Sequence, residues 1–173
     1  MFNHLSNQQQ TINNKKMEVE IRRGNRDDLP QVHALIRELA EFERAPQEVT
    51  NTLEDMELDG FGENPIYKFF VAESAEGIVG IALYYIGYST WKGKMLFLED
   101  LIVTEKLRRA GIGRKLFKAV AEEAKETRAK RFRWQVLEWN EPAIAFYKKI
   151  GASLDGEWIN CNMTEEQIQQ YVG

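Results

Sequence analysis

The stretch LEDLIV at residues 98–103, followed by RRAGIG at residues 108–113, decides the fold of this chain. The first stretch is typical of an apolar strand that carries two acidic residues. The second is a basic turn with two glycines, and it opens an amphipathic helix. Small residues let backbone N–H groups approach an anion, and the positive end of a helix dipole attracts it. We therefore predict that residues 108–113 hold a phosphate group.

Two familiar phosphate-binding loops are excluded by the residues that follow. A Walker loop requires Lys and then Ser or Thr after its last glycine, whereas Gly113 is followed by Arg114 and Lys115. A dinucleotide-binding loop requires a third glycine three positions after Gly113, where this chain has Leu116. The remaining pattern is Arg-x-x-Gly-x-Gly. Taken alone, it also fits a basic loop that only caps a helix.

The composition is that of an ordinary globular protein. A chain of 173 residues with 43% hydrophobic residues is long enough for one domain with a full core. A net charge of −4 does not favour nucleic acid as a partner. The single cysteine, Cys161, excludes an internal disulfide and a multi-cysteine zinc site, and two histidines are too few for a His-rich metal site. We expect no metal.

The chain has no apolar run close to the roughly 20 residues that a membrane helix needs, so we expect no membrane association. Residues 1–16 are rich in Asn and Gln and contain no apolar core of a signal peptide. We interpret residues 1–16 as a disordered leader and residues 17–173 as a single domain. The cytoplasm is the expected location.

Hydrophobic periodicity and capping residues predict a mixed α/β chain of the α+β class. The predicted order is β-α-α-β-β-β-α-β-α-β-α, an antiparallel meander that leads into a β-α-β unit. The crossover helix of that unit begins at the glycine loop. The predicted strands cover residues 18–23, 67–74, 78–88, 94–103, 132–137 and 158–163. The predicted helices cover about residues 28–43, from Thr50 or Thr52 to 60, 112–124, 140–150 and the chain end after the capping box of Thr164 and Gln167.

Several short segments occur together in one order. They are AEFE at 40–43, DGFG at 59–62, YSTWKG at 88–93, LED at 98–100, RRAGIG at 108–113, WNEP at 139–142, FY at 146–147 and GA at 151–152. Their joint order resembles the spermidine/spermine (diamine) acetyltransferase family of GNAT acetyltransferases, and is most similar to its thialysine-acetylating branch. The resemblance covers about residues 18–160. It implies the GNAT acyl-CoA N-acyltransferase fold, a central, mostly antiparallel twisted sheet flanked by helices, with acetyl-CoA as cosubstrate.

The resemblance also implies the catalytic residues. An alkylammonium has a pKa of about 10.4 and must lose a proton before it attacks a thioester. Glu99 is the candidate to accept that proton, through a water, and to hold the cationic amine. Tyr147 is the candidate to protonate the CoA thiolate that leaves. From the residues alone, Glu99 is equally a strand-end carboxylate in a salt bridge, and Tyr147 a core tyrosine.

The implied cofactor site extends along the chain from the strand into the helix. The backbone of Leu101, Ile102 and Val103 would bond the pantetheine amides as an added strand does. Asn140 would bond the pantetheine arm or cap its helix. The pyrophosphate would be held by the loop residues Arg108, Arg109, Ala110, Gly111, Ile112, Gly113 and Arg114. The Arg108 side chain is equally suited to bracing the loop.

For the amine, the resemblance implies Phe42 and Glu43 together with Glu99. Phe42 replaces the tyrosine of the polyamine-acetylating members, which favours the thialysine-like branch. Whether Asp155 or Glu157 reaches the substrate stays open, because the segment around them is shorter than in the family. The family also forms homodimers, with the C-terminal strand and helix packed across the interface.

The predicted function is therefore transfer of acetyl from acetyl-CoA to a primary amine of a small cationic substrate, either a diamine or polyamine or a thialysine- or lysine-like amino acid. Two alternatives remain. One is acetylation of a protein N-terminus or lysine side chain, and the other is a CoA-binding module without turnover. The presence of both Glu99 and Tyr147 argues against the second.

Overall fold

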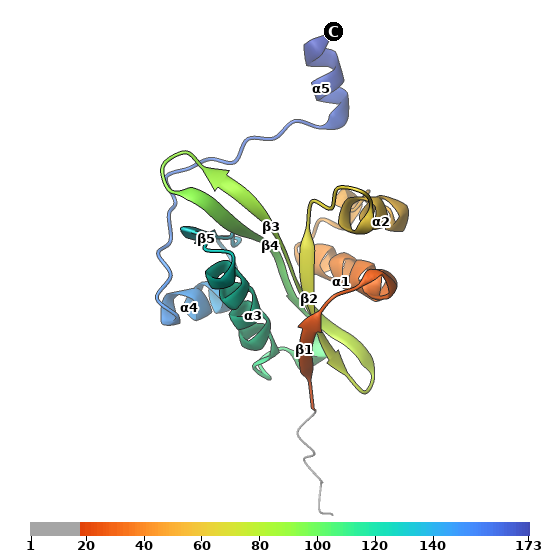
Figure 1. The fold of residues 1–173 in the computed structure, drawn as a ribbon, viewed down its shortest axis with the longest axis vertical. Helices are drawn as coiled ribbons and strands as arrows, with labels where there is room; N and C mark the ends of the chain where they lie inside the picture. The colour runs from red at the N-terminus through yellow and green to blue at the C-terminus, as the bar shows by residue number, and fades with distance from the viewer. Residues whose placement is uncertain (1–17) are drawn as a thin grey trace, which may run out of the picture. The chain divides into compact units, whose positions relative to one another are not determined.

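Five strands form one sheet in the spatial order β1-β2-β3-β4-β5 (Figure 1). The computed structural model describes residues 18–173. The first four strands pair antiparallel, and β5 pairs with β4 in parallel. A parallel pair requires a crossover, which α3 supplies between β4 and β5. The strands are β1 (Glu20–Arg23), β2 (Lys68–Ser74), β3 (Gly77–Ser89), β4 (Gly93–Val103) and β5 (Arg131–Arg133).

Side chains that prefer helix starts set where several helices begin. Thr52, of the two candidate threonines, caps α2 by accepting the N–H of Asp55, and Thr164 caps α5 by accepting the N–H of Gln167. The helices are α1 (Leu29–Phe42), α2 (Leu53–Phe61), α3 (Ile112–Glu126), α4 (Glu141–Lys149) and α5 (Glu165–Val172). The short 3-10 turns are η1 (Arg26–Asp28), η2 (Pro46–Glu48) and η3 (Glu105–Leu107).

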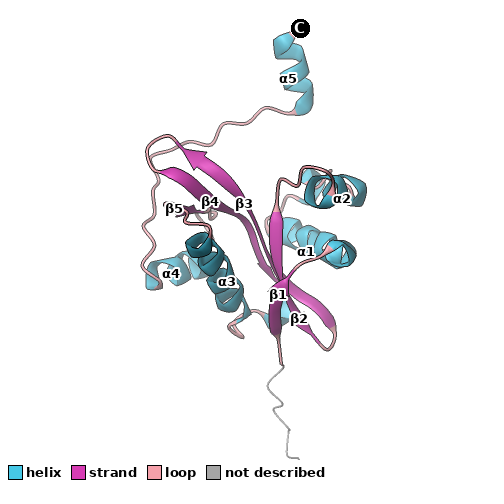
Figure 2. Ribbon diagram, viewed as in Figure 1, coloured by secondary structure: helices cyan, strands magenta, loops and turns pink. Residues whose placement is uncertain are grey.

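Two apolar layers sandwich the sheet, with α1 and α2 over one face and α3 over the other (Figure 2). The alternation of strand side chains supplies both layers. On β2, Val71 packs with α1 while its neighbour Ala72 packs with α3, and Ile81 and Ala82 divide in the same way on β3. The α3 stripe predicted from helical spacing is buried at Ile112, Leu116, Val120 and Ala124.

The alternation reverses once along β4, at a β-bulge. Leu98 pairs with Tyr84 of β3 and Asp100 pairs with Leu83, which leaves Glu99 without a partner residue. Leu98 faces the α3 layer, and after the bulge Leu101 also faces α3 while Ile102 faces α1. A bulge bends its strand and redirects its side chains. It therefore sets where the LED acids lie.

The chain divides into two compact units between Gln135 and Val136. The second unit contains α4 and α5. The strand predicted over residues 158–163 is wrong, since this segment has no strand, and Trp158 and Ile159 are 68% and 89% exposed. An apolar pattern gives a strand only where its N–H and C=O groups find a neighbouring strand to pair with. The predicted strand 132–137 shortens to β5 for the same reason, since pairing with β4 ends at Arg133.

The mixed α+β class and the order of the remaining elements are confirmed. The expected leader, residues 1–16, lies outside the described residues, and the single domain over 17–173 stays a prediction. Within residues 18–173 there is no helix with the length and apolar character needed to cross a membrane.

Candidate active site

The glycine loop ends at an open helix N-terminus. Gly111 is the residue before α3 and has a left-handed backbone with φ of 83°, which favours glycine. No side chain caps this end, and the first turn contains no acidic residue. The N–H of Lys115 donates to the Gly111 carbonyl at 3.2 Å, so the amides of residues 112–114 precede the first intrahelical bond. Such a terminus is suited to hold an anion.

Arg108 braces this loop. Its Nε donates to the Val103 carbonyl at 3.1 Å, at the end of β4. Its guanidinium carbon lies 4.4 Å from the ring centroid of Phe42, at the end of α1, in a cation–π contact. The side chain of Arg108 thus connects the glycine loop with β4 and α1. This agrees with the alternative from the sequence that Arg108 braces the loop.

One edge of β4 lacks a ladder partner over its second half. β5 pairs only with Met95–Phe97, so the described strands leave residues 98–103 unpaired on that side. The Ile102 carbonyl points toward Gly80 of β3, so the backbone groups of Leu101 and Val103 point away from β3. The Val103 carbonyl already accepts from Arg108. The groups of Leu101 and the Val103 N–H therefore face the open edge.

Three carboxylates gather where the bulge meets the end of α1. Burial, together with the negative charges of Glu99 and Glu43, raises the pKa of Asp100 to about 6. Burial also raises the pKa of Glu43. None of the salt bridges among the described residues includes Glu43, Glu99 or Asp100. The cluster is therefore suited to a cation from outside the chain.

Neither Asp100 of this cluster nor its neighbour Tyr85 was predicted from the sequence as a site residue. Asp100 follows Glu99 directly in the LED stretch, and that adjacency is the one signal in the sequence. Tyr85 on β3 has its pKa raised by burial, by the charge of Glu99 and by a hydrogen bond with Glu99. Its ring stacks on Phe97 with centroids 5.3 Å apart. Tyr85 therefore lies against the Glu99 carboxylate.

The second unit carries the other predicted residues. Asn140 caps α4, and its side chain accepts the N–H of Ala143 at 3.3 Å. Tyr147 lies on α4 and is buried, which raises its pKa to about 12. Asp155 and Glu157 are both exposed, and the Asp155 carboxylate accepts the N–H of Glu157. The roles of these residues stay predictions.

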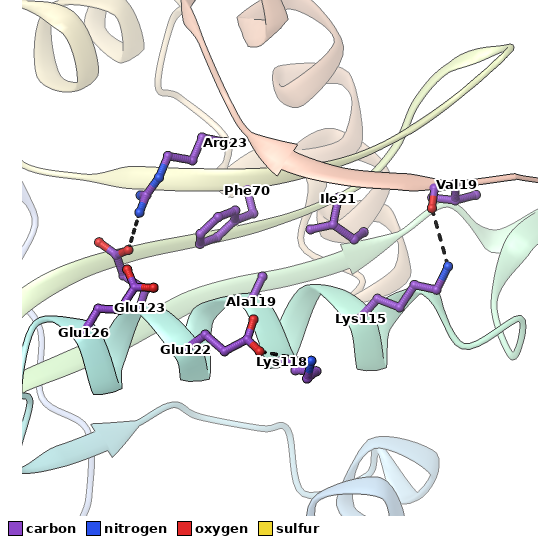
Figure 3. Close-up of a pocket in the computed structure, with 10 residues that line it drawn as sticks. All are labelled: Val19, Ile21, Arg23, Phe70, Lys115, Lys118, Ala119, Glu122, Glu123 and Glu126. Atoms are coloured by element: carbon purple, nitrogen blue, oxygen red, sulfur yellow. Dashed lines mark hydrogen bonds and ion pairs between the residues drawn. The ribbon is translucent and has the colours of Figure 1, made fainter.

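A groove between β1 and α3 is separate from these residues (Figure 3). Five of its charged side chains bond within the chain. Arg23 pairs with Glu123, Lys118 pairs with Glu122, and Lys115 donates to the Val19 carbonyl. None of the predicted site residues lines the groove.

Comparison with known proteins identifies the family. Residues 30–152 match the Acetyltransferase (GNAT) family. The chain belongs to this family. Thialysine N-epsilon-acetyltransferase of Bos taurus is 44% identical over 142 residues, covering 78% of this chain and 84% of the relative. The Mus musculus protein of that name is 38% identical over 164 residues, covering 88% and 96%. An integron cassette protein from the mobile metagenome of V. cholerae superposes with a TM-score of 0.73 at 25% identity, covering 90% and 98%.

Membership, together with these relatives, makes the chain an acetyl-CoA-dependent N-acetyltransferase and confirms the resemblance noted in the sequence. The fold agrees with it, since a mixed five-stranded sheet lies between helices. The chain covers most of the length of both relatives, so the likeness extends beyond one motif.

Asp100 makes the stability of this GNAT enzyme depend on pH. Its pKa rises from 3.8 to about 6 on folding, so the native state binds more protons than the unfolded state between these values. Stability then falls as the pH rises from about 4 to 6. Asp100→Asn removes this loss, and we expect it to raise the free energy of unfolding above pH 6.5 by about 1–3 kcal/mol, with little effect at pH 4.

Urea unfolding at pH 4, 5.5 and 7.5 measures this difference. Asp27→Asn, at an exposed aspartate in η1, is the control and should show no such rise. A gain from Asp100→Asn that is the same at all three pH values would contradict the raised pKa.

Proposed function

We propose that this enzyme acetylates a primary amine of a small cationic substrate by direct attack on acetyl-CoA. The observation that carries the proposal is the cluster of Glu43, Glu99 and Asp100, which has no cationic partner in the salt bridges of the described chain. A substrate with two positive charges, or with an ammonium beside a neutral amine, compensates several carboxylates at once. The two relatives named for thialysine support this substrate class.

Within that class, a thialysine- or lysine-like amino acid is favoured over a polyamine. Phe42 presents a ring without a hydroxyl, and that ring is already covered by Arg108. Glu43 is the next residue along the chain, and its negative charge acts on Asp100. We propose that Phe42 shapes the amine site and that Glu43 holds the ammonium that does not react.

Acetyl-CoA is held, in this proposal, along β4 and at the start of α3. The open edge of β4 offers the Leu101 backbone and the Val103 N–H to the pantetheine amides. The uncapped amides after Gly111 hold the pyrophosphate, with Arg109 and Arg114 adding positive charge. Asn140 bonds the pantetheine arm. Ile102 points its backbone toward β3, so its contribution is core packing.

The proposed chemistry assigns one role to each residue. Glu99 accepts a proton from the substrate ammonium through a water, and Tyr85 fixes the carboxylate. The neutral nitrogen attacks the carbonyl carbon of the thioester, and the C–S bond breaks as the amide C–N bond forms. Tyr147 donates its phenolic proton to the thiolate, and the tyrosinate regains a proton as the nitrogen that has attacked releases its second proton to form the neutral amide. A pKa of about 12 keeps this phenol protonated at neutral pH, ready to donate.

A substrate panel tests the proposal. Purified enzyme with acetyl-CoA is assayed for CoA release with thialysine, lysine, ornithine, putrescine and spermidine, and with a lysine peptide as control. We expect thialysine or lysine to give the highest kcat/KM and the peptide to give little. Turnover of the peptide alone would establish protein acetylation instead. CoA binding without release on any amine would establish a binding module.

Substitution of the two proposed catalytic groups gives two different results. Glu99→Gln should lower kcat/KM by about a hundredfold at pH 7 and less at pH 9.5, because more amine is neutral there. Tyr147→Phe should lower kcat by about tenfold to a hundredfold with little change in the KM for acetyl-CoA. Exposed Glu76→Gln and Tyr88→Phe are the matched controls.

The contradicting outcomes differ between the two variants. A loss in Glu99→Gln that is equal at both pH values would make Glu99 a positioning group. An unchanged kcat in Tyr147→Phe would remove Tyr147 as the acid.

We also propose that the enzyme is a cytoplasmic homodimer. The support is the apolar surface of the C-terminal segment, where the side chains are more than half exposed at Trp158, Ile159, Met163, Ile168, Tyr171 and Val172. Exposed apolar groups in this number favour burial against a partner. Light scattering should give twice the monomer mass of 20.1 kDa, and Ile159→Asp should lower it. A monomer mass at all concentrations would contradict the dimer.

A further inference from the structure

A carboxylate on α1 bonds to the segment that leads into the glycine loop. The Glu38 Oε1 atom accepts the backbone N–H of Glu105 at 2.7 Å and the Thr104 hydroxyl at 3.2 Å. Glu38 is half-buried, and 66 residues separate it from Thr104 along the chain. Bonds between an ionised carboxylate and N–H or O–H donors are among the stronger ones in proteins.

This contact supplies a cap that the local sequence does not make. Thr104 precedes η3, but its own side chain makes no capping bond. Glu38 accepts from the first residue of η3 in its place. The turn then continues through the bonds of the Leu107 N–H to Thr104 and of the Arg108 N–H to Glu105. The bond at Glu38 therefore fixes the start of the segment whose end is the glycine loop.

The same face of α1 contacts the loop a second time. Phe42 lies four residues after Glu38, one helical turn along, and its ring is covered by Arg108. Residues 104–108 thus contact α1 at both ends, through Glu38 at the start and Phe42 at the end. The next residue of the chain after Phe42 is Glu43, which belongs to the carboxylate cluster.

We infer that Glu38 is a positioning residue for acetyl-CoA, which holds the glycine loop in its binding conformation and ties it to the helix that carries the amine-binding residues. The inference rests on the proposed function, in which the loop holds the pyrophosphate. Glu38 touches neither substrate. It acts through the backbone of Glu105 and the hydroxyl of Thr104.

The expected effect follows from the population of the competent loop. When only a fraction of molecules holds the binding conformation, the apparent Kd rises by the inverse of that fraction. Loss of the Glu38 bonds leaves the start of η3 uncapped. We expect Glu38→Ala to raise the Kd for CoA and the KM for acetyl-CoA by about tenfold, with kcat changed by less than about threefold.

Four variants of the full chain isolate the contact. Glu38→Gln keeps an acceptor oxygen and should recover most of the affinity. Glu41→Ala removes an exposed glutamate from the same helix and should bind as the wild type does. Thr104→Val removes one of the two donors and should weaken binding by about threefold. Added to Glu38→Ala, it should have no further effect, since both act through one contact.

Isothermal titration with CoA and initial rates at varied acetyl-CoA are the measurements, with the melting temperature followed for each variant. Glu38→Ala that binds CoA as tightly as the wild type overturns the inference and leaves the proposed function intact, even where the melting temperature falls. Wild-type protein that binds no CoA overturns both. A tenfold loss in Glu38→Ala that Glu38→Gln restores, with Glu41→Ala unaffected, supports the inference.

Discussion

The extra residue in β4 is the constraint on which the site depends. In a regular strand, Leu98 and Ile102 would point to the same face, yet Leu98 lies in the α3 layer and Ile102 in the α1 layer. The bulge at Glu99 makes both possible. It lets one strand fill two cores while its two acids occupy the break between them. In a regular strand without the extra residue, the side chains on one side of Glu99 would point to the wrong face of the sheet.

The short pairing of β4 with β5 also shapes the site, because it leaves the second half of one β4 edge open. β5 contributes three residues to the ladder and stops opposite Phe97, two residues before the bulge. Backbone groups beyond that point have no strand beside them in the described sheet. Glu99, Asp100 and the open backbone edge of residues 101–103 therefore lie along consecutive residues of β4. In the proposed reaction, this places the amine and the thioester within reach of each other without a separate catalytic loop.

Local patterns were sufficient for some of these features and not for others. The glycine loop and the α3 stripe were predicted because each depends on residues close in sequence. The raised pKa of Asp100 depends on burial and on Glu43, which is 57 residues away. The position of Asp100 next to Glu99 in the sequence therefore did not predict its pKa. The cap from Glu38 is equally remote from η3. The strand predicted over 158–163 failed because an apolar pattern does not specify a pairing partner.

The electrostatics of the cluster connects stability with binding. The negative charges of Glu99 and Glu43 repel that of Asp100, and burial of Asp100 keeps water from screening this repulsion fully. Arg108, in the glycine loop, is engaged with the Phe42 ring at the end of α1 and with the Val103 carbonyl. The acids are left without a salt bridge in the described residues, while Arg108 remains in the loop that is proposed to hold the cofactor. In the proposed reaction, a cationic amine relieves a repulsion that folding creates, so the same charges that weaken the fold would favour the substrate.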